Sequence, residues 1–162
     1  MPKISVITPT IRINGLKVLE TALKNQDFKS FEWLICSKEK PKNIDIPHTW
    51  IVDNFEGGIW TLNRAYNKLI EQAQAPLIVS WQDYIYTKFD TLGRFNAHYE
   101  KNPNYLISAV GHKYKTVYPE VGAMVWKDPR ERNDQGSFYL TGFENIEWNM
   151  CSCPKKALYN VG

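Results

Sequence analysis

Polar side chains that could bind a phosphate-bearing ligand follow four short apolar segments of the sequence. An arginine can pair with a phosphate through its planar fork of N–H donors. A carboxylate is a common ligand for a divalent cation such as Mg²⁺ or Mn²⁺. The candidate binding residues at these four places are Thr8, Pro9, Thr10, Arg12, Ser37, Asp53, Gln82 and Asp83.

Asp83 carries the most specific chemistry of this group. A carboxylate at the end of a strand, facing a ligand crevice, can hold Mg²⁺ or Mn²⁺, which would neutralise a diphosphate and ease its departure as a leaving group. The competing interpretation is a solvated loop aspartate that caps the next helix. Arg12 is likewise either a phosphate partner or an ordinary surface arginine. Spacing alone does not decide these alternatives.

The apolar segments alternate with stretches of helical periodicity. This alternation predicts an α/β fold with a parallel sheet and right-handed crossovers. Ligands of such sheets bind beyond the carboxyl ends of the strands, where the candidate residues stand. The expected strands are Ile4–Thr8, Phe31–Cys36, Trp50–Val52, Leu77–Val79 and Leu106–Val110, and the expected helices begin at Asn14-Gly15 or cover Leu62–Ala73 and Phe89–Tyr99.

The pattern is weaker beyond residue 110. Tyr114 to Trp126 favours one or two irregular strands, and the polar stretch from Lys127 to Gly136 is typical of a mobile loop. Strand-like pieces follow between Phe138 and Cys153, and a helix is expected to start near Pro154. The chain has 162 residues and shows no internal repeat, so we expect one domain.

Several function classes are disfavoured. The net charge of +3 comes from well-mixed charges, which does not indicate a nucleic-acid partner. Neither a P-loop nor a Gly-x-Gly-x-x-Gly loop nor a Gly-x-Ser-x-Gly elbow is present, which disfavours P-loop NTPases, dinucleotide oxidoreductases and α/β hydrolases. Core packing is favoured over a sugar-stacking role for Trp60, Trp81 and Trp148.

We expect a soluble, cytoplasmic protein. No secretory leader is visible, and no apolar run approaches the length of a membrane span, although peripheral membrane association stays open. The three cysteines, Cys36, Cys151 and Cys153, favour a reducing compartment. One Cys-x-Cys pair is a weak zinc signal because structural zinc takes four ligands.

The sequence resembles family 2 glycosyltransferases over most of its length. The opening Ile4-Ser-Val-Ile-Thr-Pro-Thr10 leads into an amphipathic helix, and Gln26 precedes Glu32-Trp-Leu-Ile-Cys36 at the family's spacing. Asn67 stands before the fourth strand as the family's helix asparagine does. Residues 76–92 are similar to the segment with the family's Asp-x-Asp metal motif, and residues 151–162 to the stretch before its Gly-Gly-Phe-Asp-Glu.

The resemblance implies a GT-A fold, a Rossmann-like and mostly parallel sheet with helices on both faces. It implies a nucleoside diphosphate sugar as donor, a hydroxyl of a glycan or lipid-linked molecule as acceptor, and a divalent cation at Asp83. Thr8, Pro9, Thr10 and Arg12 would line the nucleotide, and Asn67 would face the donor. Residues 1–111 would form the donor half and residues 112–162 the start of the acceptor half.

The sequence also departs from the family. No aspartate stands near Ser37, where the family contacts the base or ribose, so Asp53 or Asn54 would take over that contact. The metal motif aligns with Gln82-Asp83-Tyr84 and lacks both outer aspartates. The catalytic base is unknown and is expected beyond Gly162, and the nearby substitutes are Asp134, Glu144 and Glu147. The alternative function is a non-catalytic module that binds a nucleotide or glycan; a nucleotidyltransferase is less favoured.

Overall fold

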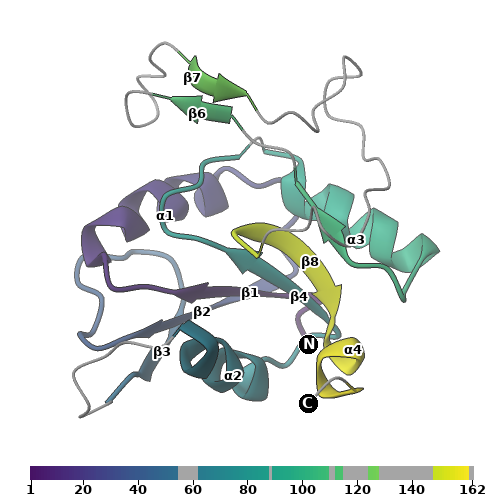
Figure 1. Ribbon diagram of the computed structural model, residues 1–162, viewed down its shortest axis with the longest axis horizontal. Coiled ribbons are helices and arrows are strands. Elements are labelled where there is room, and N and C mark those ends of the chain that lie inside the picture. Colours follow the sequence, from purple (N-terminus) through teal and green to yellow (C-terminus); the bar gives the residue numbers. More distant parts are fainter. Residues whose placement is uncertain (55–61, 88, 110–111, 115–123, 128–147, 161–162) are drawn as a thin grey trace.

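The computed structural model describes residues 1–54, 62–87, 89–109, 112–114, 124–127 and 148–160. Its main element is a six-stranded sheet with the strand order β3-β2-β1-β4-β8-β5 (Figure 1). A separate two-stranded sheet pairs β6 with β7 in antiparallel fashion. The strands are β1 (Ile4–Pro9), β2 (Phe31–Ser37), β3 (Thr49–Val52), β4 (Leu77–Trp81), β5 (Ile107–Ser108), β6 (His112–Tyr114), β7 (Met124–Lys127) and β8 (Met150–Pro154).

The first four strands confirm the predicted parallel sheet. β1 pairs in parallel with both β2 and β4, and β2 pairs in parallel with β3. β8 departs from the simple alternation: it pairs antiparallel with β4 on one side and with β5 on the other. The fifth predicted strand, β5, is shorter than expected. It is separated from β4 by β8, which comes from near the end of the chain.

Helices cover both faces of the sheet, as predicted (Figure 1). On one face, apolar residues of α1 and α3 pack against alternate residues of β1, β2 and β4, including Trp33 and Trp81. On the other face, Ala65, Tyr66 and Leu69 of α2 pack against the residues in between. The helices are α1 (Leu16–Lys24), α2 (Leu62–Gln72), α3 (Thr91–Lys101) and α4 (Lys155–Asn160), with a short 3-10 helix η1 (Ile13–Gly15) before α1.

Two polar residues of the family-like motif bind backbone groups in this scaffold, and of these Gln26 is buried and Glu32 is partly buried. The Gln26 Oε1 accepts the N–H of Leu92 at 2.9 Å in the first turn of α3, and its Nε2 donates to the carbonyl of Ala22 at 3.1 Å. The Glu32 Oε1 accepts the N–H of Gln74 at 2.7 Å, just before β4. Both side chains satisfy backbone groups where elements join, so these motif residues support the fold rather than the chemistry.

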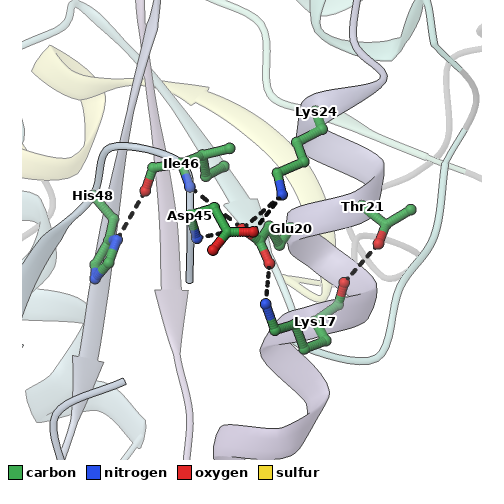
Figure 2. Close-up of polar contacts among 7 residues, drawn as sticks. All are labelled: Lys17, Glu20, Thr21, Lys24, Asp45, Ile46 and His48. Carbon is green, nitrogen blue, oxygen red and sulfur yellow. Dashed lines mark hydrogen bonds and ion pairs between the residues drawn. The ribbon is translucent and has the colours of Figure 1, made fainter. Parts of the chain in front are cut away.

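A buried carboxylate ties the connection between β2 and β3 to α1 (Figure 2). The side chain of Glu20 is 3% exposed and accepts hydrogen bonds from Lys17 at 2.8 Å and from the N–H of Asp45 at 2.6 Å. Its carboxylate also accepts the N–H of Ile46 at 3.3 Å and lies 3.1 Å from Lys24. Burial alone raises the pKa of Glu20, but the hydrogen bonds from Lys17, the Asp45 backbone and Lys24 outweigh it and lower the pKa to about 2.

Candidate functional site

The carboxyl ends of β1, β2, β3 and β4 meet at one edge of the sheet. The strand register places Pro9 beside Cys36 and Ser37 beside Val52. Two backbone hydrogen bonds continue this alignment past the strand ends, from Thr10 to the Cys36 carbonyl and from Asp53 to the Ser37 carbonyl, both at 2.9 Å. The predicted site residues that follow these four strands therefore lie along a common edge.

Asp83 is the centre of the charged contacts at this edge. Its side chain is 1% exposed, and the Arg12 Nη2 donates to Oδ1 at 2.5 Å. The Arg12 Nε donates to Oδ2 at 3.2 Å, and the Thr10 hydroxyl donates to the same oxygen. Thr10 also accepts the backbone N–H of Arg12 at 2.8 Å, which fixes the turn after β1. Both carboxylate oxygens are thus bound by groups of the protein.

Arg12 joins this buried carboxylate to the surface. Its side chain is 58% exposed, and its guanidinium lies 4.7 Å from the centre of the Tyr84 ring. The hydrogen bond with Asp83 raises the pKa of Arg12, against the opposing effect of burial. Arg12 is therefore a permanent cation with one side held by Asp83 and the ring of Tyr84.

The arrangement does not fit the predicted metal role of Asp83. A cation ligand must offer an oxygen lone pair to the metal, and here a cation could reach Asp83 only if Arg12 moved away. No group of three or more His, Cys, Asp or Glu side chains that could hold a metal occurs within the described residues. The metal role of Asp83 stays a prediction.

Gly15 is needed where η1 packs against Asp83. A Cβ at Gly15 would lie 2.8 Å from the backbone oxygen of Asp83 and 3.3 Å from its Cβ. A contact this short with backbone cannot be relieved by rotating a side chain. We expect the absence of a side chain at Gly15 to set the distance between the turn after β1 and the turn after β4.

We predict that Gly15→Ala lowers the free energy of unfolding by about 1–3 kcal/mol, because the added methyl group overpacks the contact. Gly93→Ala in α3 is the matched control, since its Cβ would meet Asp27 at an ordinary 3.6 Å. Alanine also favours helix over glycine, so the control is expected to be neutral or stabilising by about 0.5–1 kcal/mol. Urea unfolding followed by fluorescence measures both; equal effects of the two changes would contradict this role of Gly15.

Three other predicted site residues use their side chains inside the fold. The Thr8 hydroxyl donates to the carbonyl of Trp81 at 2.9 Å and accepts the Trp33 indole N–H at 3.0 Å. The Ser37 hydroxyl donates to the carbonyl of Glu39 at 2.7 Å. The Gln82 amide donates to the Tyr66 hydroxyl on α2 at 2.7 Å. Thr8 and Ser37 thus shape the edge, and a ligand would meet mainly their backbone.

Asp53 forms a second ion-pair cluster at the end of β3. Its side chain is 1% exposed and receives three hydrogen bonds from Arg64 on α2, at 2.9, 3.0 and 3.1 Å. The Lys68 Nζ lies 3.6 Å from the same carboxylate. Arg64 therefore holds Asp53 in place. Asn67 lies on the same helix and is exposed to solvent.

A polar network between α2 and β4 was missed by sequence reasoning. The Tyr66 hydroxyl lies 2.8 Å from the Ser80 hydroxyl, accepts the Gln82 amide at 2.7 Å and donates to the carbonyl of Trp148 at 3.2 Å. Burial raises the pKa of Tyr66 to about 12, although Ser80 and Gln82 partly offset this. Tyr66 is therefore a neutral structural group. The sequence did contain a signal for this network. Tyr66 stands within an apolar helical stripe, and the strand that this helix faces contains Ser80.

The tryptophans and cysteines fall mostly in the core. Trp81 is fully buried, and Trp148 packs against Tyr66 with ring centres 5.8 Å apart, while Trp60 lies outside the described residues. All three cysteines are buried and unpaired. Burial raises the pKa of Cys36 and of Cys153 to about 11, so these thiols are protonated at neutral pH. The suggested substitutes for a base, Asp134, Glu144 and Glu147, also lie outside the described residues.

No protein-family model matches the sequence, and no curated protein matches it. Solved structures do resemble it. A mannosyltransferase from Pyrobaculum calidifontis, in complex with GDP-Man and Mn²⁺, matches 99% of this chain and 47% of its own, with a TM-score of 0.66 at 15% identity. A structure of S. aureus TarS 1-349 in complex with UDP-GlcNAc matches 64% of this chain and 33% of its own, with a TM-score of 0.50 at 19% identity.

A third similar structure belongs to a cytidylyltransferase. The 2-C-methyl-D-erythritol 4-phosphate cytidylyltransferase from Thermus thermophilus matches 99% of this chain and 74% of its own, with a TM-score of 0.51 at 11% identity. The chain spans less than half of the mannosyltransferase and TarS structures. None of the helices within the described ranges is long and apolar enough to span a bilayer.

The matches to solved structures show that the chain has the α/β fold of GT-A-type glycosyltransferases, with a six-stranded, mostly parallel sheet between helices.

Proposed function

We propose that this chain is a glycosyltransferase domain that binds a nucleoside diphosphate sugar beyond the carboxyl ends of β1 to β4. It would transfer the sugar to a hydroxyl of a glycan or lipid-linked acceptor. The observation that carries the proposal is the set of charged and polar groups at this edge, with Arg12 exposed over the buried Asp83. Ligands of open α/β sheets bind at this position.

The contacts divide the proposed donor site into two parts. Arg12, held by Asp83 after β1 and β4, would contact the diphosphate, since a guanidinium binds phosphate oxygens with two N–H donors. The end of β3, with Asp53 held by Arg64, would lie against the base or ribose. The backbone of Thr8, Pro9, Thr10 and Ser37 would shape the floor between them, with Gln82 and Asn67 on the side of α2.

The first test is a calorimetric titration of the chain with UDP and GDP. We expect measurable binding of at least one diphosphate and much weaker binding of UMP, GMP and the free nucleosides, because these controls lack the group that meets Arg12. A dissociation constant of about 1 mM corresponds to a standard binding free energy of roughly −4 kcal/mol. The proposal would be contradicted if neither diphosphate bound at ligand concentrations up to about 1 mM.

A non-catalytic nucleotide-binding module is the second candidate, and the pairing of Asp83 favours it. The carboxylate expected to assist departure of the diphosphate is engaged by Arg12 and Thr10. Incubation with a panel of UDP-sugars and GDP-sugars separates the two candidates. An enzyme would release nucleoside diphosphate by slow hydrolysis or transfer, whereas a binding module would bind the donors and leave them intact over days.

A further inference from the structure

We propose that Arg12 takes the place of a divalent cation, so that this chain binds the diphosphate of its donor without a metal. The inference rests on the proposed function and concerns how the same site neutralises the charge of its ligand. Its basis is the geometry of the Arg12–Asp83 pair, in which the cation is exposed and the carboxylate is buried.

Both oxygens of the Asp83 carboxylate are engaged by the protein. A metal ligand at this position would need a free approach to one carboxylate oxygen. Here Oδ1 accepts Arg12 at 2.5 Å, and Oδ2 accepts both Arg12 at 3.2 Å and the Thr10 hydroxyl. A metal that displaced Arg12 would give up these charge-assisted hydrogen bonds, which are the stronger kind in proteins.

Arg12 is held in position and still has N–H donors for a ligand. Asp83 engages the Nε and Nη2 groups of a side chain that has five N–H donors, so further donors remain for a ligand. The ring of Tyr84 at 4.7 Å and the backbone hydrogen bond to Thr10 limit how far the residue can move. Because this cation is held in place before the ligand arrives, less conformational entropy is lost when the ligand binds.

The two ion-pair clusters along the edge together carry a positive charge. Arg12 faces Asp83 after β1 and β4, and Arg64 and Lys68 both face Asp53 after β3. Three cations against two carboxylates leave a net charge of +1 within these two clusters. Because both carboxylates are 1% exposed and Arg12 is 58% exposed, an approaching anion meets the positive groups first.

The test compares binding of UDP and GDP in EDTA with binding in Mn²⁺. The variants are Arg12→Lys, which keeps the charge but loses the fork of donors, and the double variant Arg12→Ala with Asp83→Asn, which avoids leaving a buried unpaired carboxylate. Arg94→Ala is the matched control, since Arg94 pairs with Asp90 at 2.7 Å at the start of α3. Circular dichroism checks that each variant is folded.

We expect wild-type affinity to change less than about threefold between EDTA and Mn²⁺. In EDTA, the double variant should bind at least about tenfold more weakly, Arg12→Lys should fall between, and Arg94→Ala should match the wild type. Binding that requires Mn²⁺, or a double variant that binds normally in EDTA, would overturn this inference and leave the proposed function standing. Absence of binding in both solutions would overturn the proposed function as well.

Discussion

Truncation of Trp33 to alanine is expected to lower the free energy of unfolding by about 3–5 kcal/mol, the usual cost of removing a large aromatic side chain from a core. Trp33 is 1% exposed and belongs to the cluster between the sheet and the helices α1 and α3. Its indole N–H also donates to the Thr8 hydroxyl, which in turn donates to the carbonyl of Trp81. Loss of Trp33 therefore opens a cavity directly under the end of β1.

Trp33→Phe is the control that separates packing from hydrogen bonding. Phenylalanine keeps much of the buried ring but cannot donate to Thr8, so we expect a cost of about 1–2 kcal/mol. Urea unfolding followed by circular dichroism measures both variants. A Trp33→Ala protein within about 1 kcal/mol of the wild type would show that this side chain does not hold the core as described.

Replacement of Glu20 by alanine is expected to lower the free energy of unfolding by about 2–3 kcal/mol at pH 7. The change leaves the N–H groups of Asp45 and Ile46 without their acceptor and removes the partner of Lys17 and Lys24. Both lysines are about half exposed and can return to water, which keeps the cost below that of a fully buried pair. Glu71→Ala on the exposed face of α2 is the control and should change stability by less than about 0.5 kcal/mol.

The contribution of Glu20 should also depend on pH. Its pKa is lowered from 4.5 to about 2 in the folded protein, so its stabilisation is fully present above about pH 5 and is lost as the pH falls towards 2. The neutral variant Glu20→Gln lacks this dependence. The difference in unfolding free energy between wild type and Glu20→Gln should therefore be constant from pH 7 to 5 and shrink below pH 4.5. A difference that stays constant down to about pH 3 would contradict the lowered pKa.

The parallel part of the sheet could be predicted because its signals are local. Each of the first four strands is a short apolar run followed by a turn and a helical stripe or a polar loop, and β1 to β4 appear within a few residues of their expected bounds. The position of β8 could not be predicted in this way. Its place between β4 and β5 depends on pairing across a long stretch of sequence, which no local pattern encodes.

The edge of the site could be predicted, but not the partners of its residues. Strand ends alone place Thr10, Asp53 and Asp83 at one edge. Whether Asp83 faces a ligand or Arg12 depends on side-chain directions that the sequence pattern does not specify. The same holds for Asp53 and Arg64, which come from different elements.

The buried Glu20 did have a sequence signal. It lies four residues after Leu16 and three before Leu23, so it falls within the apolar stripe of α1 rather than on its solvated face. A carboxylate in that position must find donors, and the connection between β2 and β3 supplies them. A charged residue inside an apolar stripe therefore predicts a buried contact.

The proposed function requires that a nucleoside diphosphate binds at the carboxyl edge of this sheet. Two-dimensional NMR of the ¹⁵N-labelled chain, titrated with UDP and with GDP, tests it most directly. We expect the backbone amide signals of Thr10, Arg12, Ser37, Asp53 and Asp83 to shift together and saturate, while those of α3 around Arg94 and His98 stay in place. Saturable shifts confined to α3 or to other surfaces, or no shifts with either nucleotide, would contradict it.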